Sequence, residues 1–187
     1  MDLVFFGIQG SGKGTQAKKL AAEFGYEIFE AGGELRAIAA SGTELGETVK
    51  GYIDQGDLVP HEIIMQVVKE AIAARPADQK IIFDGIPRDS EQQTDFDKVM
   101  KETGRDFRCI EIHLDAEEGV RRILERAKEQ GRADDADESI IRRRMDTFLT
   151  KTMPVIKDYK SKGKMIEVEG QGSMEDVYGR IVSALAL

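Results

Sequence analysis

Cysteine is almost absent from this sequence of 187 residues, in which Cys109 is the only one. A single cysteine cannot form an intrachain disulfide or a zinc site built from paired cysteines, so we expect neither. Cys109 lies in the apolar alternation of residues 108–114, which favours a buried and unreactive thiol.

Long apolar runs are absent as well, and no stretch approaches the ~20 consecutive apolar residues of a membrane-spanning helix. Acidic residues outnumber basic residues by 35 to 27, which gives a formal net charge of −8. This charge disfavours nonspecific binding to nucleic acid or to anionic lipid, so phosphate groups would need a local cluster of basic residues. The first residues also lack the signature of a targeting peptide. We therefore expect a cytoplasmic protein that binds neither nucleic acid nor membrane.

Short β-rich segments alternate with segments of helical periodicity along the chain. The β-rich segments are residues 3–8, 26–29, 80–85, 108–114 and 164–170. Strands that alternate with helices form a parallel sheet with helices on both faces. The length of the chain suits one α/β domain with a small insertion. The sequence therefore predicts a five-stranded parallel sheet covered on both faces.

Two segments depart from this alternation. Residues 30–59 have helical spacing but are long for a crossover, so we expect a small helical excursion between the second and third strands. Residues 126–139 are polar, contain no aliphatic residue larger than alanine and centre on Gly131. This composition is typical of a mobile loop that joins two helices.

A glycine-rich segment, GIQGSGKGT at residues 7–15, follows the first apolar strand and precedes a helix. Glycines allow successive backbone N–H groups to turn inward, the helix N-terminus adds partial positive charge, and Lys13 can reach the outer phosphates. The segment therefore predicts a phosphate-binding loop. In GTPases and many ATPases a hydroxyl follows the lysine and binds Mg²⁺. Here Gly14 follows, and the hydroxyl comes at Thr15, which argues against those classes and indicates another way of placing the metal.

This loop and five further motifs resemble the nucleoside monophosphate kinases, and among them most closely the adenylate kinases with a short lid. The further motifs are GGELR (32–36), GDLVP (56–60), DGIPR (84–88), GRADD (131–135) and RRRM (142–145). The resemblance spans essentially the whole chain. It implies one P-loop kinase domain over residues 1–187, in which residues 30–59 form the NMP-binding insertion and residues 126–136 the short lid. The family usually has proline in place of Gln9, a difference that we expect to change loop stiffness more than chemistry.

Arginine is concentrated in one stretch, because seven of the thirteen arginines fall between residues 121 and 144. Phosphoryl transfer spreads negative charge over several oxygens, and the protein contributes mainly position and positive charge. Several arginines that converge on one point suit this reaction. For part of the stretch a second explanation is favoured, because Arg121, Arg142 and Arg143 can pair with glutamates along an exposed helix face.

The resemblance assigns four of these arginines to the site: Arg122, Arg126, Arg132 and Arg144. Arg122 would pack near the donor base, and the other three would belong to the lid and its hinge. Arg144 is preferred to Arg143 on its distance from Pro154, with Arg143 as the alternative. Closure of the lid over ATP would exclude water that would otherwise hydrolyse it. The lid contains no cysteine, which excludes the zinc-bearing lid of some relatives.

Asp84 and Arg88 begin and end the DGIPR motif at the carboxyl end of the third strand, where open α/β folds bind ligands. By resemblance, Arg88 would bind the acceptor phosphate. Mg²⁺ would be held by ATP phosphates and water rather than by protein ligands, and Asp84 and Thr15 would orient it. Zinc is not expected.

Three sets of site residues follow from the resemblance. The residues expected to act in catalysis are Lys13, Asp84, Arg88, Arg126, Arg132 and Arg144. Those expected to bind ATP are Gly10, Ser11, Gly12, Lys13, Gly14, Thr15, Arg122, Arg126 and Gly172. Those expected to bind the acceptor nucleotide are Ala31, Arg36, Asp57, Leu58, Val59, Gly85, Ile86, Pro87, Arg88, Gln92, Arg132 and Arg144.

Two residues indicate different acceptor bases. Ala31 stands where adenylate kinases usually have threonine, and it resembles the UMP/CMP kinases. Gln92 matches the adenylate kinase amide that pairs with the adenine edge, and an amide can bind a purine through two hydrogen bonds. We weigh Gln92 above Ala31. Gly33 also replaces an acidic residue that is common in the family.

The sequence therefore predicts a monomeric kinase that transfers a phosphoryl group reversibly between ATP and AMP with Mg²⁺. A UMP/CMP kinase of the same family is the first alternative. The second is a nucleotide-binding switch or hydrolase, which would have no use for Arg36, for the DGIPR motif or for a second binding excursion.

Overall fold

The computed structural model describes the backbone of residues 1–130 and 137–187, and the side chains of residues 1–125 and 137–187. This part of the chain forms a five-stranded sheet in the order β2-β3-β1-β4-β5. The strands are β1 (Asp2–Phe6), β2 (Glu27–Glu30), β3 (Ile81–Asp84), β4 (Phe107–His113) and β5 (Met165–Glu169). Each pair of neighbours is parallel, so the predicted five-stranded parallel sheet is confirmed.

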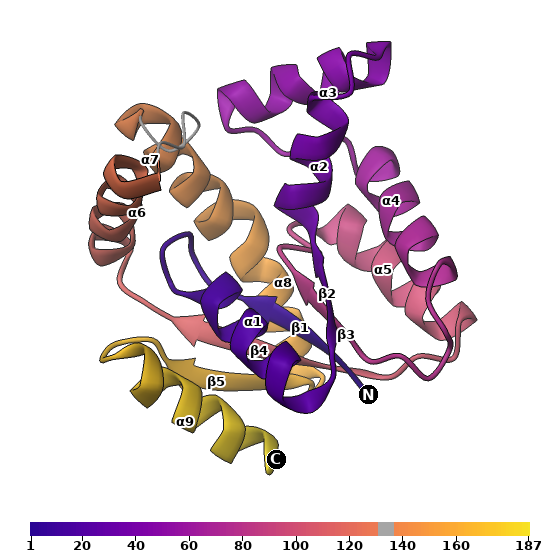
Figure 1. The fold of residues 1–187 in the computed structure, drawn as a ribbon, viewed down its shortest axis with the longest axis vertical. Helices are drawn as coiled ribbons and strands as arrows, with labels where there is room; N and C mark the ends of the chain where they lie inside the picture. Colours follow the sequence, from indigo (N-terminus) through magenta and orange to yellow (C-terminus); the bar gives the residue numbers. More distant parts are fainter. Residues whose placement is uncertain (131–136) are drawn as a thin grey trace.

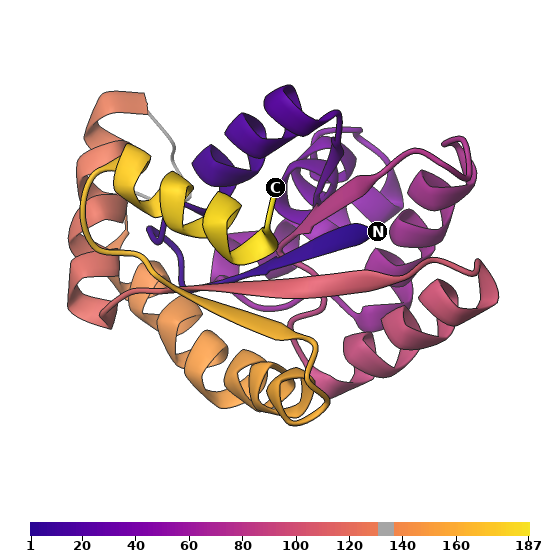
Figure 2. The ribbon, with the colours of Figure 1, turned by 90° about the horizontal axis from the view of Figure 1, so that it is seen from below.

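Helices cover both faces of the sheet (Figure 1 and Figure 2). One face carries α4 (His61–Ala73), α5 (Ser90–Glu102) and α8 (Met153–Ser161), and the other carries α1 (Lys13–Phe24) and α9 (Met174–Leu185). Side chains alternate between the two faces along a strand, and in β1 Val4 and Phe6 join the first core while Leu3 and Phe5 join the second. None of the described helices is long and apolar enough to cross a membrane.

The helical excursion expected between the second and third strands is present. α2 (Ala31–Ala39) follows β2 without a break, and α3 (Glu44–Gln55) returns the chain toward α4. Thr43 begins α3 as its N-cap, since its hydroxyl accepts the backbone N–H of Gly46 at 3.0 Å. Both helices stand beyond the carboxyl end of β2, apart from the helices that cover the sheet (Figure 1).

The loop predicted over residues 126–139 is shorter than expected. α6 (Ala116–Gln130) continues through residues 126–130, and α7 (Glu138–Thr147) begins after the N-cap Asp137. The prediction is wrong for residues 126–130 because it weighed only their polarity, whereas arginine, alanine, lysine, glutamate and glutamine are all good helix formers. Residues 131–136, which contain most of the expected lid, lie outside the described residues.

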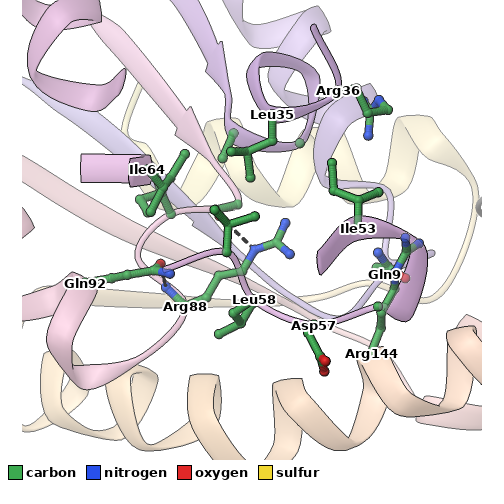
Figure 3. Close-up of a pocket in the computed structure, with 16 residues that line it drawn as sticks. Gln9, Leu35, Arg36, Ile53, Asp57, Leu58, Ile64, Arg88, Gln92 and Arg144 are labelled. Carbon is green, nitrogen blue, oxygen red and sulfur yellow. Dashed lines mark hydrogen bonds between the residues drawn. The ribbon is translucent and has the colours of Figure 1, made fainter. Parts of the chain in front are cut away.

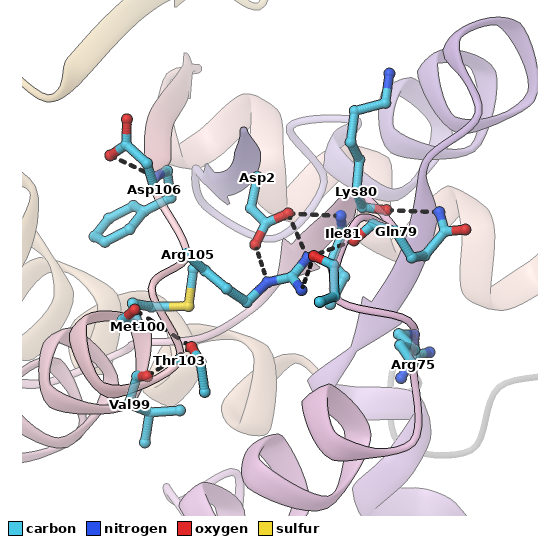
Figure 4. Close-up of polar contacts among 12 residues, drawn as sticks. Asp2, Arg75, Gln79, Lys80, Ile81, Val99, Met100, Thr103, Arg105 and Asp106 are labelled. Carbon is cyan, nitrogen blue, oxygen red and sulfur yellow. Dashed lines mark hydrogen bonds and ion pairs between the residues drawn. The ribbon is translucent and has the colours of Figure 1, made fainter.

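A buried ion pair joins three segments at the amino-terminal end of the sheet (Figure 4). Arg105 donates from Nε and Nη2 to the two carboxylate oxygens of Asp2, at 2.6 and 3.0 Å. The two side chains are 8% and 3% exposed. Arg105 also donates to the carbonyls of Ala77 and Gln79, and Asp2 accepts the backbone N–H of Ile81 at 2.9 Å. The pair therefore ties β1 to the segments that enter β3 and β4.

Arg105→Ala should lower the free energy of unfolding by about 3–5 kcal/mol, because the charge of Asp2 would stay buried without its partner. Urea denaturation at neutral pH measures this change. Arg108→Ala is the matched control, since Arg108 is exposed on β4, and its effect should stay within about 0.5 kcal/mol. Equal losses in the two variants would contradict the role given to the ion pair.

Candidate active site

The glycine-rich loop runs from the end of β1 to the first residue of α1, which is Lys13. Gly10 has a φ of +82°, and a Cβ at this position would lie 2.6 Å from the carbonyl oxygen of Gly119 in α6. Glycine is therefore required there both for the backbone conformation and for the close contact with α6. Because α1 begins in the loop, the positive end of the helix dipole lies there, as anion binding requires.

Two polar side chains of the loop have different positions. The ammonium of Lys13 donates to the carbonyls of Gly7 at 2.6 Å and Ile8 at 3.0 Å, so it lies across the loop. Ser11 is 2% exposed, and its Oγ lies 2.7 Å from the point that a Cβ on Gly7 would occupy. The backbone N–H of Ser11 donates to Ile8. Ser11 therefore packs beneath the loop rather than facing a ligand, which differs from its predicted role.

Three hollows that share lining residues lie beside the loop. The largest, which we call the loop hollow, has a volume of about 350 Å³. It is lined by Gln9, Gly10, Gly12, Lys13, Gly14, Thr15, Lys18, Glu30, Gly32, Arg36, Asp84, Gly85, Arg88 and Arg122. Of the residues expected to bind ATP, the loop glycines, Lys13, Thr15 and Arg122 are thus brought together. Gly172, which follows β5 and packs against Asp176, lines none of the three hollows described here.

The second hollow, which we call the insertion hollow, has a volume of about 110 Å³ and lies between α2, α3 and the end of β3 (Figure 3). The residues predicted to bind the acceptor that line it are Ala31, Arg36, Asp57, Leu58, Val59, Gly85, Ile86, Arg88, Gln92 and Arg144. Pro87 lines the third hollow instead, a space of about 60 Å³ between β1 and the segment that follows α7. The side chain of Arg126 and all of Arg132 lie outside the described residues.

Arg88 is held by hydrogen bonds to three other segments. Its Nε donates to the carbonyl of Gly85 and its backbone N–H donates to Oε1 of Gln92, each at 2.8 Å (Figure 3). Its carbonyl accepts the hydroxyl of Thr152 at 2.7 Å. Gly85 has a φ of +84°, and a Cβ there would lie 2.8 Å from Nη2 of Arg88. Only glycine therefore leaves room for this arrangement.

Thr152 is a site residue that sequence reasoning missed. It is 4% exposed and ends a π-helix, Phe148–Thr152, which connects α7 to α8. Such π-helical turns occur often at functional sites. No sequence pattern marks this turn, and its hydrogen bond joins residues that are 64 positions apart.

Charge is concentrated around Asp84, which is 9% exposed. Burial raises the pKa of Asp84, and the nearby charges of Lys13 and Arg88 oppose this shift. Burial lowers the pKa of Arg88, the charges of Arg144 and Arg36 act in the same direction, and Asp84 opposes them. Four cationic side chains thus act on one carboxylate region, and this excess of positive charge favours an anion in the hollows.

Arg144 and Arg143 face different surroundings. Arg144 lines the insertion hollow and the third hollow. Arg143 is 53% exposed at its side chain and pairs with the carboxylate of Asp57 at 2.7 Å. The geometry therefore agrees with the preference for Arg144.

Other arginines of the same stretch pair with carboxylates on the helix surface. Arg121 pairs with Glu118 and Glu125, each at 2.7 Å. Arg142 pairs with Glu138 and Glu117. The predicted pairing of these two arginines along an exposed helix face is confirmed.

Two predicted ligands of phosphate or base also have carboxylate partners. Arg36 donates to Glu30 at 2.9 Å, and Arg122 donates to Glu118 at 2.8 Å. Glu30 was not among the predicted residues, although it lines the loop hollow. Its Oε2 lies 3.7 Å from the point that a Cβ on Gly33 would occupy. An acidic group is therefore present beside the turn even though residue 33 is glycine.

The loop hollow has oxygen donors suited to Mg²⁺. The carboxylate of Asp84 lies 3.5 Å from the point that a Cβ on Gly14 would occupy, and Thr15 lines the same hollow. Within residues 1–125 and 137–187, no group of three or more histidine, cysteine or acidic side chains could hold a metal by itself. Mg²⁺ commonly keeps several waters and binds through one or two carboxylates together with substrate phosphates. The residues present fit that mode.

Known proteins are similar to this chain over nearly its whole length. Residues 5–164 match the family model described as adenylate kinase. An adenylate kinase of Thermus thermophilus is 40% identical over 186 residues, which cover 99% of this chain and 97% of the relative. That of Maricaulis maris is 39% identical and that of Phocaeicola vulgatus 37%, each covering 99% of this chain and 98% of the relative.

Asp84→Asn should raise the melting temperature of the protein at pH 7 in the absence of nucleotide. Burial raises the pKa of Asp84, so the folded protein is less stable with the carboxylate ionised, and asparagine removes that charge. The gain should vanish below the ordinary aspartate pKa of about 4, where both side chains are neutral, and grow as the pH rises. Thermal melts across this pH range measure it.

Asp78→Asn is the matched control, because Asp78 is exposed and its replacement should leave the pH profile unchanged. The phosphoryl-transfer activity of Asp84→Asn should move in the opposite direction, with turnover lower by about 100-fold. A melting temperature that falls at pH 7, or that differs equally at acid and neutral pH, would contradict this account of Asp84.

Proposed function

The chain belongs to the adenylate kinase family and is an adenylate kinase, and from this premise we propose which of its residues transfer the phosphoryl group between ATP and AMP. One observation supports the proposal above the others. Arg88 lines the loop hollow, the insertion hollow and the third hollow, so it lies where a donor and an acceptor phosphate would meet.

ATP is proposed to bind with its phosphates in the loop hollow. Lys13 and the N-terminus of α1 would neutralise phosphate charge, and Gly10, Gly12 and Gly14 would let the backbone approach the phosphates. Arg122 would lie near the donor base. Mg²⁺ bound with ATP would neutralise charge on the phosphate oxygens, and Asp84 and Thr15 would orient its waters. Gly172, which the resemblance also assigned to ATP, lies outside these hollows.

AMP is proposed to bind in the insertion hollow. Arg36, Arg88 and Arg144 would bind its phosphate, and the base would lie against the segment 57–59 and Gln92. Oε1 of Gln92 already accepts the backbone N–H of Arg88. An amide oxygen has two lone pairs, so Gln92 can still offer both an acceptor and its NH₂ donors to an adenine edge. Ala31 would contribute packing but no hydroxyl.

The transfer itself needs no side chain as nucleophile or general base. The AMP phosphate is already ionised near neutral pH and attacks the terminal phosphoryl group of ATP directly. The part of the protein is to align the two nucleotides and to stabilise the charge spread over the transferring oxygens. Arg126 and Arg132 are proposed to complete this set from the lid.

The domain organisation belongs to the same proposal. One kinase domain over residues 1–187 would contain an NMP-binding insertion at 30–59 and a short lid at 126–136. Because the hollows are lined within a single chain, a monomer would suffice for activity. We also propose a cytoplasmic location and nucleotides as the only ligands, without zinc.

The choice of acceptor is tested by a coupled assay with ATP·Mg²⁺ and one monophosphate at a time. AMP should give the highest kcat/KM, and CMP and UMP much lower values. A clear preference for CMP would give Ala31 more weight than Gln92. Equal ATP turnover with and without a monophosphate would instead indicate a hydrolase or switch.

Arg88→Ala should lower kcat by about 10²–10³-fold, because it removes a charge from the point where the transferred phosphoryl group carries most negative charge. The far-UV circular dichroism spectrum should stay unchanged. Arg142→Ala is the matched control, since Arg142 is exposed and pairs on the helix surface, and it should retain nearly full activity. Near-normal turnover in Arg88→Ala would remove Arg88 from the proposed site.

A further inference from the structure

We propose that the side-chain amide of Gln9 contacts the phosphoryl group as it passes from ATP to AMP, and that Gln9 is a catalytic residue in addition to the basic side chains. This inference rests on the proposed function and adds to it a residue for which proline is usual in the family.

The position of Gln9 is the first observation. Within the described part of the chain, only Gln9, Gly85 and Arg88 line all three hollows. Gly85 has no side chain, and the side chain of Arg88 is charged. Gln9 is therefore the one neutral polar side chain among them, on the side of the insertion hollow away from Gln92 (Figure 3). A group that moves between the loop hollow and the insertion hollow must pass it.

An unsatisfied polar atom is the second observation. Oε1 of Gln9 is buried and has no hydrogen-bond partner among the residues that the structure describes. A buried polar atom without a partner costs about 1–3 kcal/mol, so a native protein rarely keeps one without a reason. Two other described side chains, Ser11 and Gln16, have such an atom, but neither lines a hollow. Gln9 alone combines an unsatisfied atom with a place in the hollows.

The chemistry of an amide suits this place. Its NH₂ group can donate to an oxygen of the transferring phosphoryl group, while its oxygen accepts from an arginine or from water that enters with the nucleotides. Lys13, Arg88 and Arg144 line the same space and repel one another. An amide adds a directed hydrogen bond without adding another positive charge. A donor aimed at the transferring oxygens acts most strongly in the transition state, where charge is spread over them.

Gln9→Met tests the inference, because methionine keeps the length of the side chain and removes both the donors and the acceptor. We expect kcat to fall about 10- to 100-fold, with the KM values for ATP and AMP changed by less than about threefold. The loss is partial because the basic side chains remain, and because the family's usual proline offers no amide at all.

Gln16→Met is the matched control. Gln16 is 3% exposed and also has an unpartnered Oε1, but its Nε2 donates to the carbonyl of Met174 at 2.9 Å, beneath α9. The same substitution there removes a buried amide outside the hollows, so kcat should stay within about twofold of wild type. Thermal melts of both variants show how much each change affects folding.

The outcomes separate this inference from the proposed function. A wild-type protein without AMP-dependent turnover would overturn the proposed function. If the wild type is active, a kcat of Gln9→Met within about twofold of wild type, or equal losses in Gln9→Met and Gln16→Met, would overturn the inference. Should Gln9→Met fail to fold, Gln9→Glu keeps the shape but replaces the donors with a negative charge. Its kcat should fall further than about 100-fold, and wild-type turnover would overturn the role of Gln9.

Discussion

The parallel pairing of β1 with β3 is the interaction on which the site depends. It sets Phe5 opposite Asp84, so the glycine-rich loop after β1 and the DGIPR motif after β3 leave the same edge of the sheet together. The register is fixed by burial on both faces, because a slip of one residue would turn Leu3 and Phe5 toward the opposite core. The loop hollow and Arg88 lie next to each other as a consequence.

This arrangement gathers charge where burial makes charge costly. Burial shifts the pKa values of Asp84 and Arg88 toward their neutral forms, and their mutual attraction offsets part of that cost. The other basic side chains around Arg88 add repulsion that a bound phosphate chain would relieve, so nucleotides should stabilise the fold. The site therefore reflects a balance in which charges placed for phosphate binding reduce the stability of the free protein.

Much of the fold could be predicted because its signals are local. Alternating apolar residues identified the strands, and helical spacing identified α2 and α3 as an excursion. The prediction failed for residues 126–130, where polarity was weighed without helix propensity. In the site, the motifs indicated which residues would gather, and most described ones line the hollows. Ser11 and Gly172 do not, because a motif records position along the chain and not the direction in which a side chain points.

The sequence by itself determined the phosphate-binding loop, the order of strands and helices, and the concentration of arginine in one stretch. These properties follow from backbone preferences and burial patterns that act over a few residues. Only the tertiary structure decided that Arg144 faces the hollows while Arg143 pairs with Asp57, that Thr152 holds the carbonyl of Arg88, and that Gln9 lies between the hollows. Such contacts join segments far apart in the chain, and they depend on how the helices pack against the sheet.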